Sequence, residues 1–233
     1  MEMFLQQLVN GLSLGSIYAL MALGYTMVYG IIGLINFAHG DVYMVGAFFG
    51  FWLITGLGMN IILALILTMI FTAILGVIIE RVAYKPLRKS TRIAALITAI
   101  GVSYLLQNFM IYYVGPEVRA FPTSLPNLSL DLGLFTISTQ QVVIFIVTII
   151  LMIALQYIVR QTKMGQGMRA VSVDADAARL MGISVDNVIS FTFAIGSALA
   201  GAGGVLVGIY YNSISPTMGL TPGIKAFVAA VLG

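Results

Sequence analysis

The sequence predicts an all-α protein, a polytopic bundle of transmembrane helices in a single domain over 1–233. Hydrophobic residues make up 60% of the chain and charged residues only 8%, whereas soluble domains carry about 25% charged residues. Charge is absent from 3–40, 42–79, 93–116, 132–159 and 187–224. About 20 apolar residues span a bilayer as a helix, which satisfies its own backbone. Runs such as 61–79 lack the alternation of a membrane β-barrel, which is therefore excluded.

The apolar runs place spans near 7–35, 42–58, 60–80, 93–114, 140–159 and 188–211. A further segment opens at about 224 and reaches Gly233, which is too short to cross. Truncation or a re-entrant segment would explain it, and we expect that the chain lacks a C-terminal part. Glu2 precedes the first span without Lys or Arg, so the pattern is not that of a cleaved signal peptide.

Basic residues predict the orientation of the bundle. They cluster in two connections, one with Arg81, Lys85, Arg88, Lys89 and Arg92, the other with Arg160, Lys163, Arg169 and Arg179. Connections rich in Lys and Arg stay in the cytoplasm, and the two spans between these connections agree with that parity. The intervening loop, 115–138, has Arg119 as its only basic residue and contains Pro116, Pro122 and Pro126, so we expect it outside, on the periplasmic face.

The N-terminal part allows two topologies. A run over 7–35 is long for one span, and Gly30, Gly33, Asn36 and Gly40 can each break it. We expect a broken or re-entrant helix near 30–45. A turn at 36–41 on the cytoplasmic side would place the N-terminus outside, whereas broken helices over 30–56 that dip in and return would place it inside.

Five polar residues are candidates for a substrate pathway: Asn36, His39, Asp41, Gln107 and Asn108. Polar groups at membrane depth are costly and face a cavity or a partner. Asp41 could instead serve only to cap the following helix, His39 could be a hydrogen-bonded interior histidine, and the two amides could bond neighbouring helices. In the functional alternative, free amides at the broken helix hold a carboxylate while Asn36, His39 or Asp41 meets an amino group.

Small residues recur at four-residue spacing, as in Gly11 and Gly15, Gly46 and Gly50, and Gly204 and Gly208. Such spacing predicts close helix packing. Gly15-Ser16 also resembles Gly196-Ser197 in its flanking residues, which indicates either an internal repeat or low-complexity composition.

Composition excludes several functions. Without cysteine and with one histidine, the chain offers no disulfide, no thiol nucleophile and no cysteine-held or multi-histidine metal site, and we expect no bound metal. Little remains for acid–base catalysis, so we expect no catalytic residues and no cofactor. The net charge of +3 reflects the two basic connections and implies no nucleic-acid partner.

The polar loop over 160–187 predicts a short amphipathic helix that stops at Gly182. Its apolar positions are Val171, Ala175, Ala178, Met181 and Leu180, opposite Asp174, Asp176 and Arg179. Such a helix could lie on lipid headgroups, where bulky apolar side chains give affinity. Small side chains such as Ala175, Ala177 and Ala178 instead favour insertion into a protein groove.

Three segments together resemble the high-affinity branched-chain amino acid permeases of ABC importers, over about 4–233. They are Ile35-Asn36-Phe37-Ala38-His39-Gly40-Asp41, Glu80-Arg81-Val82-Ala83-Tyr84-Lys85-Pro86-Leu87-Arg88 and residues 165–183. The resemblance identifies the polar loop as the coupling loop, with Arg169, Asp174, Ala177, Ala178, Arg179, Gly182 and Ile183 in contact with an ATPase subunit.

The resemblance also implies an inner-membrane permease in a bacterial lipid bilayer. It implies a second related permease in a heterodimer, two cytoplasmic ATPase subunits, and a periplasmic binding protein that delivers leucine, isoleucine or valine. ATP belongs to the partners, because no G-x-x-x-x-G-K-[ST] pattern occurs in this chain. Similar permeases carry urea, short amides or other amino acids, and an ion-coupled secondary transporter is the other alternative.

Overall fold

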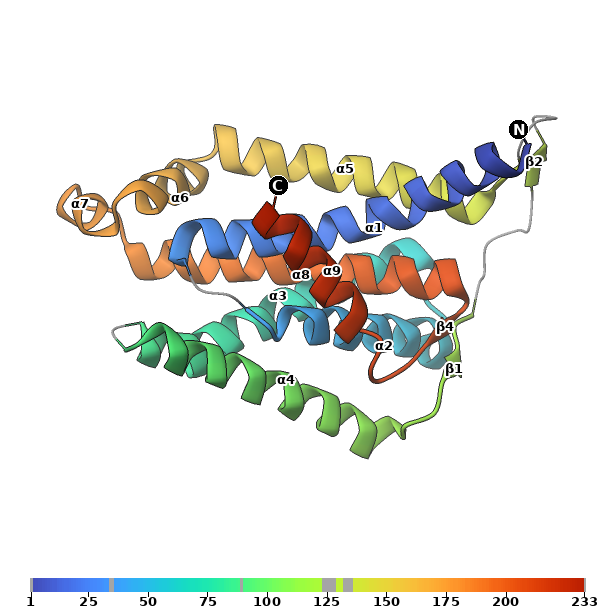
Figure 1. Ribbon diagram of the computed structural model, residues 1–233, viewed down its shortest axis with the longest axis horizontal. Coiled ribbons are helices and arrows are strands. Elements are labelled where there is room, and N and C mark those ends of the chain that lie inside the picture. Colours follow the sequence, from blue (N-terminus) through green and yellow to red (C-terminus); the bar gives the residue numbers. More distant parts are fainter. Residues whose placement is uncertain (1, 34–35, 89, 123–128, 132–135, 233) are drawn as a thin grey trace.

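The structure, a computed structural model, describes residues 2–33, 36–88, 90–122, 129–131 and 136–232; Lys89 and Pro126 of the predicted connections lie outside these ranges. Long helices form the bundle in Figure 1: α1 (Glu2–Ile32), α2 (His39–Leu57), α3 (Ile61–Ile79), α4 (Arg92–Val114), α5 (Thr139–Gln161) and α8 (Val185–Tyr211). Within the described residues, six helices are long and apolar enough to cross a membrane. The predicted polytopic helical fold is confirmed.

Shorter elements connect these helices. On one side of the bundle they are the π-helical turn η1 (Glu80–Tyr84), the 3₁₀ turn η2 (Lys85–Leu87), α6 (Lys163–Val173) and α7 (Ala175–Leu180). Elsewhere they are β1 (Arg119–Ala120), β2 (Ser129–Asp131), β3 (Thr136–Ser138), β4 (Ser213–Ile214) and α9 (Leu220–Leu232). Strand β1 pairs antiparallel with β4, and β2 pairs antiparallel with β3. The proline-rich loop 115–138 thus carries strands in its described part, and no helix.

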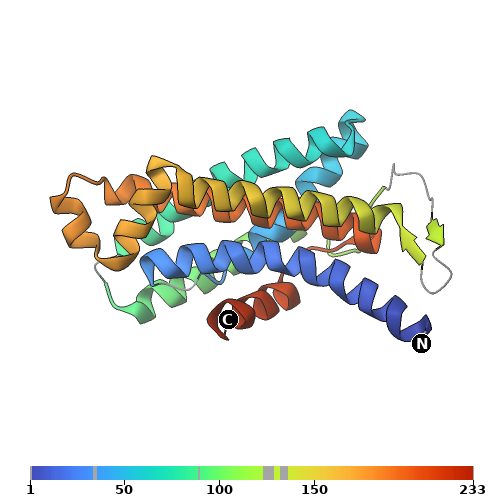
Figure 2. The same cartoon turned by 90° about the horizontal axis from the view of Figure 1, so that it is seen from above.

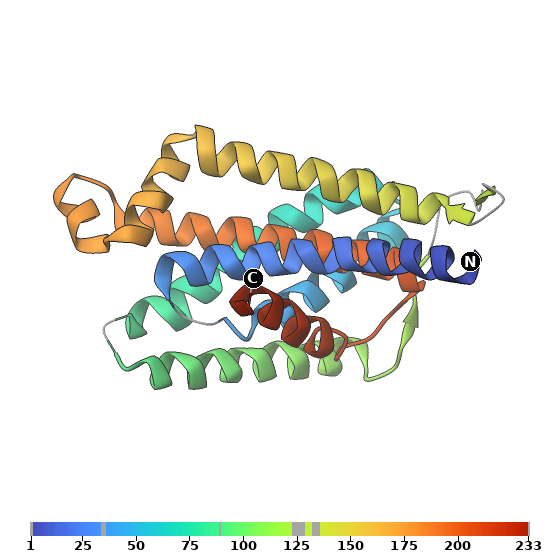
Figure 3. The ribbon, with the colours of Figure 1, turned by 45° about the horizontal axis from the view of Figure 1, so that its top comes forward.

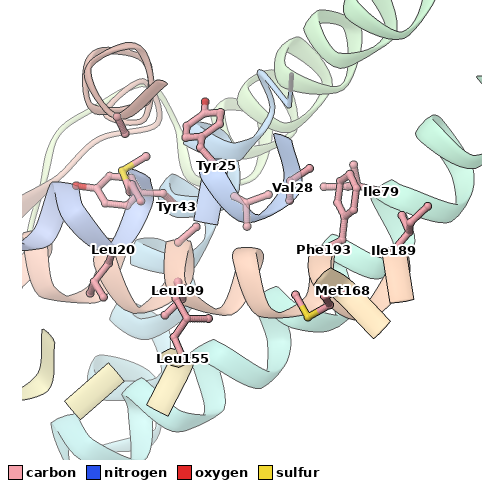
Figure 4. Close-up of a cluster of buried hydrophobic side chains, with 14 of the residues drawn as sticks. Leu20, Tyr25, Val28, Tyr43, Ile79, Leu155, Met168, Ile189, Phe193 and Leu199 are labelled. Atoms are coloured by element: carbon pink, nitrogen blue, oxygen red, sulfur yellow. The ribbon is translucent and has the colours of Figure 1, made fainter. Parts of the chain in front are cut away.

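Helix α8 occupies the centre of the bundle. Its most apolar window is 83% buried within the chain, whereas the corresponding windows of α4 and α5 are 17% buried. Figure 4 shows Phe193 of α8 beside Ile79 of α3 and Val28 of α1, all three in the apolar core. Helices α4 and α5 therefore leave apolar surface for lipid or for another membrane protein.

Glycines let α2 and α3 approach α8 closely. A Cβ on Gly46 would lie 2.6 Å from the Cα of Gly201, and a Cβ on Gly204 would overlap the carbonyl oxygen of Tyr43. The predicted packing role of these glycines is confirmed. By contrast, a Cβ on Gly11 or Gly15 would meet no described atom within 4 Å.

The two basic connections lie at the same end of the bundle, called here the basic end. An ion pair of 2.9 Å joins Lys85 of the first connection to Asp186, near the end of the second. Figure 3 shows α6 and α7 extending beyond the long helices at this end. The N-terminus lies at the other end, where the Gln6 side chain donates to the Thr136 carbonyl over 3.0 Å.

Of the two N-terminal topologies, the structure agrees with the one in which the chain crosses the bundle once before α2. Helix α1 crosses the bundle once without a break and stops at Gly33, whose φ of 66° is the left-handed conformation that ends helices. The chain then returns into the bundle, and α2 begins at His39, part-way along it (Figure 1). The predicted break near 30–45 is confirmed, and the N-terminus lies opposite the basic end.

Helix α9 also begins inside the bundle. It starts at Leu220, four residues before the predicted position, where the backbones of Gly219 and Gly40 touch. Figure 2 shows α1 between α5 and α9. The starts of α2 and α9 thus meet at one point of the bundle.

The helix pairs α1–α2 and α8–α9 are two copies of one motif with opposite direction. Gly33 and Asn212, which end α1 and α8, both have positive φ, 66° and 52°. The His39 amide donates to the Asn36 carbonyl over 3.1 Å, as the Met218 amide does to that of Ser215. Each feature recurs after 179 residues. The structure thus supports an internal inverted repeat.

Sequence identities fall at the same spacing. Identical residues 179 positions apart are Val9 and Val188, Ala19 and Ala198, Leu20 and Leu199, Gly24 and Gly203, Val28 and Val207, Ile35 and Ile214, Gly40 and Gly219, Ala47 and Ala226, Phe48 and Phe227, and Leu53 and Leu232. The predicted match of Gly15-Ser16 with Gly196-Ser197 is therefore in the wrong register by two residues. Composition alone misled that alignment, because small residues recur every few positions in both helices.

We expect Gly204→Ala to lower the free energy of unfolding by about 1–3 kcal/mol, because the new methyl group meets the α2 backbone. Gly15→Ala is the matched control, since it adds the same methyl group to a helix where space is open. Unfolding of both variants in mixed micelles measures the difference. Equal stability of the two variants would contradict the packing argument.

Candidate functional site

A cavity of about 200 Å³ opens where the starts of α2 and α9 meet α4. Its wall combines apolar side chains with a few polar groups. The lining residues are Tyr25, Phe37, Gly40, Asp41, Ile100, Ser103, Tyr104, Gln107, Gly219, Leu220, Gly223, Ile224 and Phe227. Its volume is below the roughly 300–1,000 Å³ of drug-sized ligand sites, so it suits a ligand smaller than a drug molecule.

Asp41 places a carboxylate on the wall of this cavity. The residue is only 3% exposed, and its Oδ1 accepts a 2.8 Å hydrogen bond from Nε2 of Gln107 on α4. Gln107 is also 3.3 Å from the Ser103 hydroxyl. The alternative of capping alone does not hold, because no side chain caps α2 and the Asp41 carboxylate reaches across to α4. Asp41 lies in the first turn of α2, where the helix dipole favours negative charge.

The other predicted pathway residues lie elsewhere. His39 is buried against the Tyr25 ring at 4.6 Å and points to α1, so His39 and Asp41 diverge as helical spacing predicts. Asn36 is buried and accepts a 3.0 Å hydrogen bond from the Tyr84 hydroxyl. Asn108 is exposed on α4 and donates to the Tyr104 carbonyl over 2.8 Å. The structure thus brings Asp41 and Gln107 together and leaves the other three outside the cavity lining.

Backbone amides at the start of α2 are largely occupied. Those of Asp41 and Val42 donate to the Ala38 carbonyl over 3.0 Å, and that of His39 donates to Asn36. These three amides cannot also hold a substrate carboxylate in this conformation. The expected amide site is therefore wrong for them, because the chain turns tightly enough before α2 to satisfy its own donors.

The polar loop contains two helices where the sequence predicted one. Helix α6 ends at Val173, and the Asp174 side chain then accepts 2.9 Å hydrogen bonds from the amides of Asp176 and Ala177, which caps α7. An aspartate that caps a new helix interrupts the apolar periodicity read across it. The single-helix prediction is wrong for this reason.

The predicted stop at Gly182 is confirmed. Gly182 has φ of 84°, its amide donates to Arg179, and the Ile183 amide donates to the Ala178 carbonyl. This pair of hydrogen bonds is a Schellman motif, which requires the left-handed conformation that glycine adopts most easily. It turns the chain back toward α8.

The apolar face of the loop is split. Val171 and Ala178 are buried, whereas Leu180 and Met181 are 89% and 82% exposed at the tip. Arg179 pairs with the exposed Asp176, over 3.1 Å, and Ala177 is exposed. Arg169 donates to the Val159 carbonyl at the end of α5. The tip thus presents apolar and charged side chains outward from the basic end.

A charged cluster beside the loop, built around a buried carboxylate, was missed by the sequence analysis. We call it the clamp: Glu80, Arg88, Asp186 and Ser190. Glu80 is fully buried and is bound by the Arg88 guanidinium and by the Ser190 hydroxyl, the latter at 2.6 Å. Arg88 also reaches Asp186 at 2.6 Å. A lone glutamate at the end of a 19-residue apolar helix, α3, was the available signal.

Comparisons with known proteins agree with this architecture. Residues 7–233 match the family described as the permease component of branched-chain amino acid transport systems. The high-affinity branched-chain amino acid transport permease LivH of Salmonella typhimurium is 47% identical, and the match covers 99% of this chain and 79% of that protein. LivH of Escherichia coli K12 is 46% identical and BraD of Pseudomonas aeruginosa 45%, with the same coverage. No solved structure matches the chain.

We expect Arg88→Met to lower the free energy of unfolding by about 3–5 kcal/mol, because it leaves the buried Glu80 carboxylate without its cation. The double variant Glu80→Gln with Arg88→Met should recover part of that loss. Arg179→Met is the control, since it breaks an exposed ion pair worth about 0–1 kcal/mol. Denaturant unfolding of the three proteins tests this, and an equal loss in both single variants would refute the buried-charge argument.

Proposed function

Because the chain belongs to the branched-chain amino acid transport permease family, we propose that it is the membrane subunit of an ATP-driven importer of leucine, isoleucine and valine. It is a multi-pass membrane protein, and we place it in the bacterial inner membrane. A second related permease, two cytoplasmic ATPase subunits and a periplasmic binding protein complete the importer. Its relatives are permeases rather than enzymes. We assign ATP binding to the partner subunits.

The lining of the cavity at the start of α2 supports a branched-chain amino acid as the substrate. The Asp41 carboxylate can accept hydrogen bonds from an ammonium group, while Ile100, Ile224 and Phe227 offer apolar contact to an aliphatic side chain. A small aliphatic amino acid has both features. Urea lacks the charge and the apolar side chain, so this wall favours the amino acid over the alternative cargo.

The basic end supports the coupling role. Its excess of Lys and Arg supports a cytoplasmic position for this end, with the loop over 115–138 on the periplasmic side. Leu180 and Met181 are exposed at the tip of the loop 160–187, on a short helix held by a cap at one end and the Gly182 turn at the other. Exposed apolar side chains on a rigid, water-facing element suit a protein partner. We assign that surface to the ATPase.

Uptake of labelled leucine into vesicles that hold the full transporter and its binding protein tests the proposal. We expect uptake only with ATP on the ATPase side and little uptake of urea under the same conditions. Urea uptake would keep the ATP-driven mechanism and change the cargo. Leucine uptake that is indifferent to ATP would point to an ion-coupled transporter and overturn the assignment.

Asp41→Asn and Gln107→Ala should each lower leucine uptake, by about ten-fold for Asp41→Asn, because a hydrogen bond to a charged group contributes roughly 1.5–3 kcal/mol. Asn108→Ala is the matched control, since it removes an amide from the neighbouring position outside the cavity. Initial uptake rates at equal amounts of assembled transporter give the comparison. If Asn108→Ala and Gln107→Ala behave alike, the cavity is not on the path.

Replacing Gly182 with valine should weaken the association with the ATPase or uncouple hydrolysis from uptake. Its φ of 84° strains a β-branched side chain, and open space around it means that strain alone acts. Gly101→Val, in a helix with open space, is the control. Copurified ATPase and substrate-stimulated hydrolysis are the measurements, and normal values of both for Gly182→Val would count against the coupling role.

A further inference from the structure

The clamp holds a carboxylate that neither the cavity nor the loop tip uses. Glu80 opens η1 at the end of α3 and is fully buried. Both of its oxygens are bonded, one to Arg88 and the other to the Ser190 hydroxyl of α8 at 2.6 Å. A buried carboxylate is costly unless charged and polar partners surround it, so these contacts are hard to break one at a time.

The clamp reaches the coupling loop through Asp186. This residue lies in the first turn of α8, four positions after Gly182. Its carboxylate binds Arg88 at 2.6 Å and Lys85 at 2.9 Å. The segment that leaves α7 is therefore attached to the connection between α3 and α4 by two cations.

The π-helical turn η1, which begins with Glu80, also contacts the segment before α2. Tyr84 closes η1, and its hydroxyl donates to Oδ1 of Asn36 over 3.0 Å, with both residues at most 3% exposed. Asn36 in turn accepts the His39 amide through its own carbonyl. Asp41 follows two residues later, on the cavity wall.

We propose that the clamp and the Tyr84–Asn36 hydrogen bond form one polar connection that passes displacement of the coupling loop to residues 36–41. This inference rests on the proposed function, since it assumes that the loop is moved by a partner. Glu80 and Tyr84 are positioning residues for transport: neither lines the cavity, and each acts through Asn36 on the turn that holds Asp41.

The geometry of η1 favours a connection that passes movement from the coupling loop to residues 36–41, rather than one that only stabilises the basic end. Glu80 and Tyr84 are the two ends of a five-residue π-helical turn, closed by the Lys85 amide on the Glu80 carbonyl. π-helical turns are rare and are frequent at functional sites. The Tyr84 ring also packs on Phe193 of α8 at 5.2 Å. The turn is thus held at both ends, so a shift of one end displaces the other.

Hydrogen exchange of the assembled transporter in nanodiscs tests the connection without ATP or leucine. We expect Tyr84→Phe to speed exchange of the amides in 36–41 by about five-fold, the effect of one ordinary hydrogen bond. Asp186→Asn, which touches none of these residues, should speed it as well. The double variant should exchange no faster than Tyr84→Phe alone, because both changes break the same connection.

Glu117→Gln and Tyr157→Phe are the matched controls, since they make the same kinds of change at exposed positions and should leave 36–41 as in the unmodified protein. Faster exchange in Asp186→Asn that stays within 80–90 and 174–190 would mean that the clamp only reinforces the basic end. Additive effects in the double variant would mean two separate interactions. Either result overturns the proposal.

Transport gives a second readout. Tyr84→Phe and Asp186→Asn should move less leucine per ATP hydrolysed, with the controls unchanged. An unchanged ratio in both variants would overturn the proposal. Absence of ATP-dependent leucine uptake in the unmodified transporter would instead refute the proposed function, and hydrogen exchange would still decide whether the connection exists.

Discussion

Close packing of α2 and α3 on α8 is the constraint on which the rest of the structure depends. Glycines at the crossings, such as Gly46 against Gly201, bring backbones into contact and leave no room for side chains between them. The start of α2 is thereby drawn into the bundle together with Asn36, His39 and Asp41, all buried. Polar groups placed there cannot turn to water, so each must find a partner within the protein.

The hydrogen-bond partners of two buried carboxylates, Glu80 and Asp41, distinguish a residue that links parts of the protein from one that can bind cargo. Glu80 is bonded through both carboxylate oxygens and is not part of the cavity lining, so it acts by linking elements of the protein rather than by contact with the cargo. Asp41 accepts hydrogen bonds from the neutral side chains of Gln107 and Ser103 and lines a cavity with acceptor capacity left. Burial alone does not distinguish the two residues. The difference is that Glu80 is paired with a cation inside the protein, whereas Asp41 has neutral partners and lines the cavity.

Local signals in the sequence predicted the spans, the break near Gly33 and the stop at Gly182, because apolar length and glycine act within a few residues. Helical phase could not be read in α4, which is apolar on most sides, so Gln107 and Asn108 seemed equivalent until α2 and α9 fixed which one faces the cavity. The clamp joins residues up to 110 positions apart, Glu80 and Ser190. In the sequence, Arg88 indicated only which end of the bundle faces the cytoplasm, because Asp186 and Ser190 lie far away along the chain.

The inverted repeat shows that a similar backbone in both copies does not by itself give a polar binding site. Both copies end a helix in the left-handed conformation, turn through the same hydrogen bond and start a helix inside the bundle. At the positions of Asn36, His39 and Asp41, however, the second copy has Ser215, Met218 and Leu220. Only the first copy has a carboxylate in the helix start and a bond to the basic end. The fold thus brings two similar helix starts to one cavity, and the side chains of the first copy give that cavity its carboxylate.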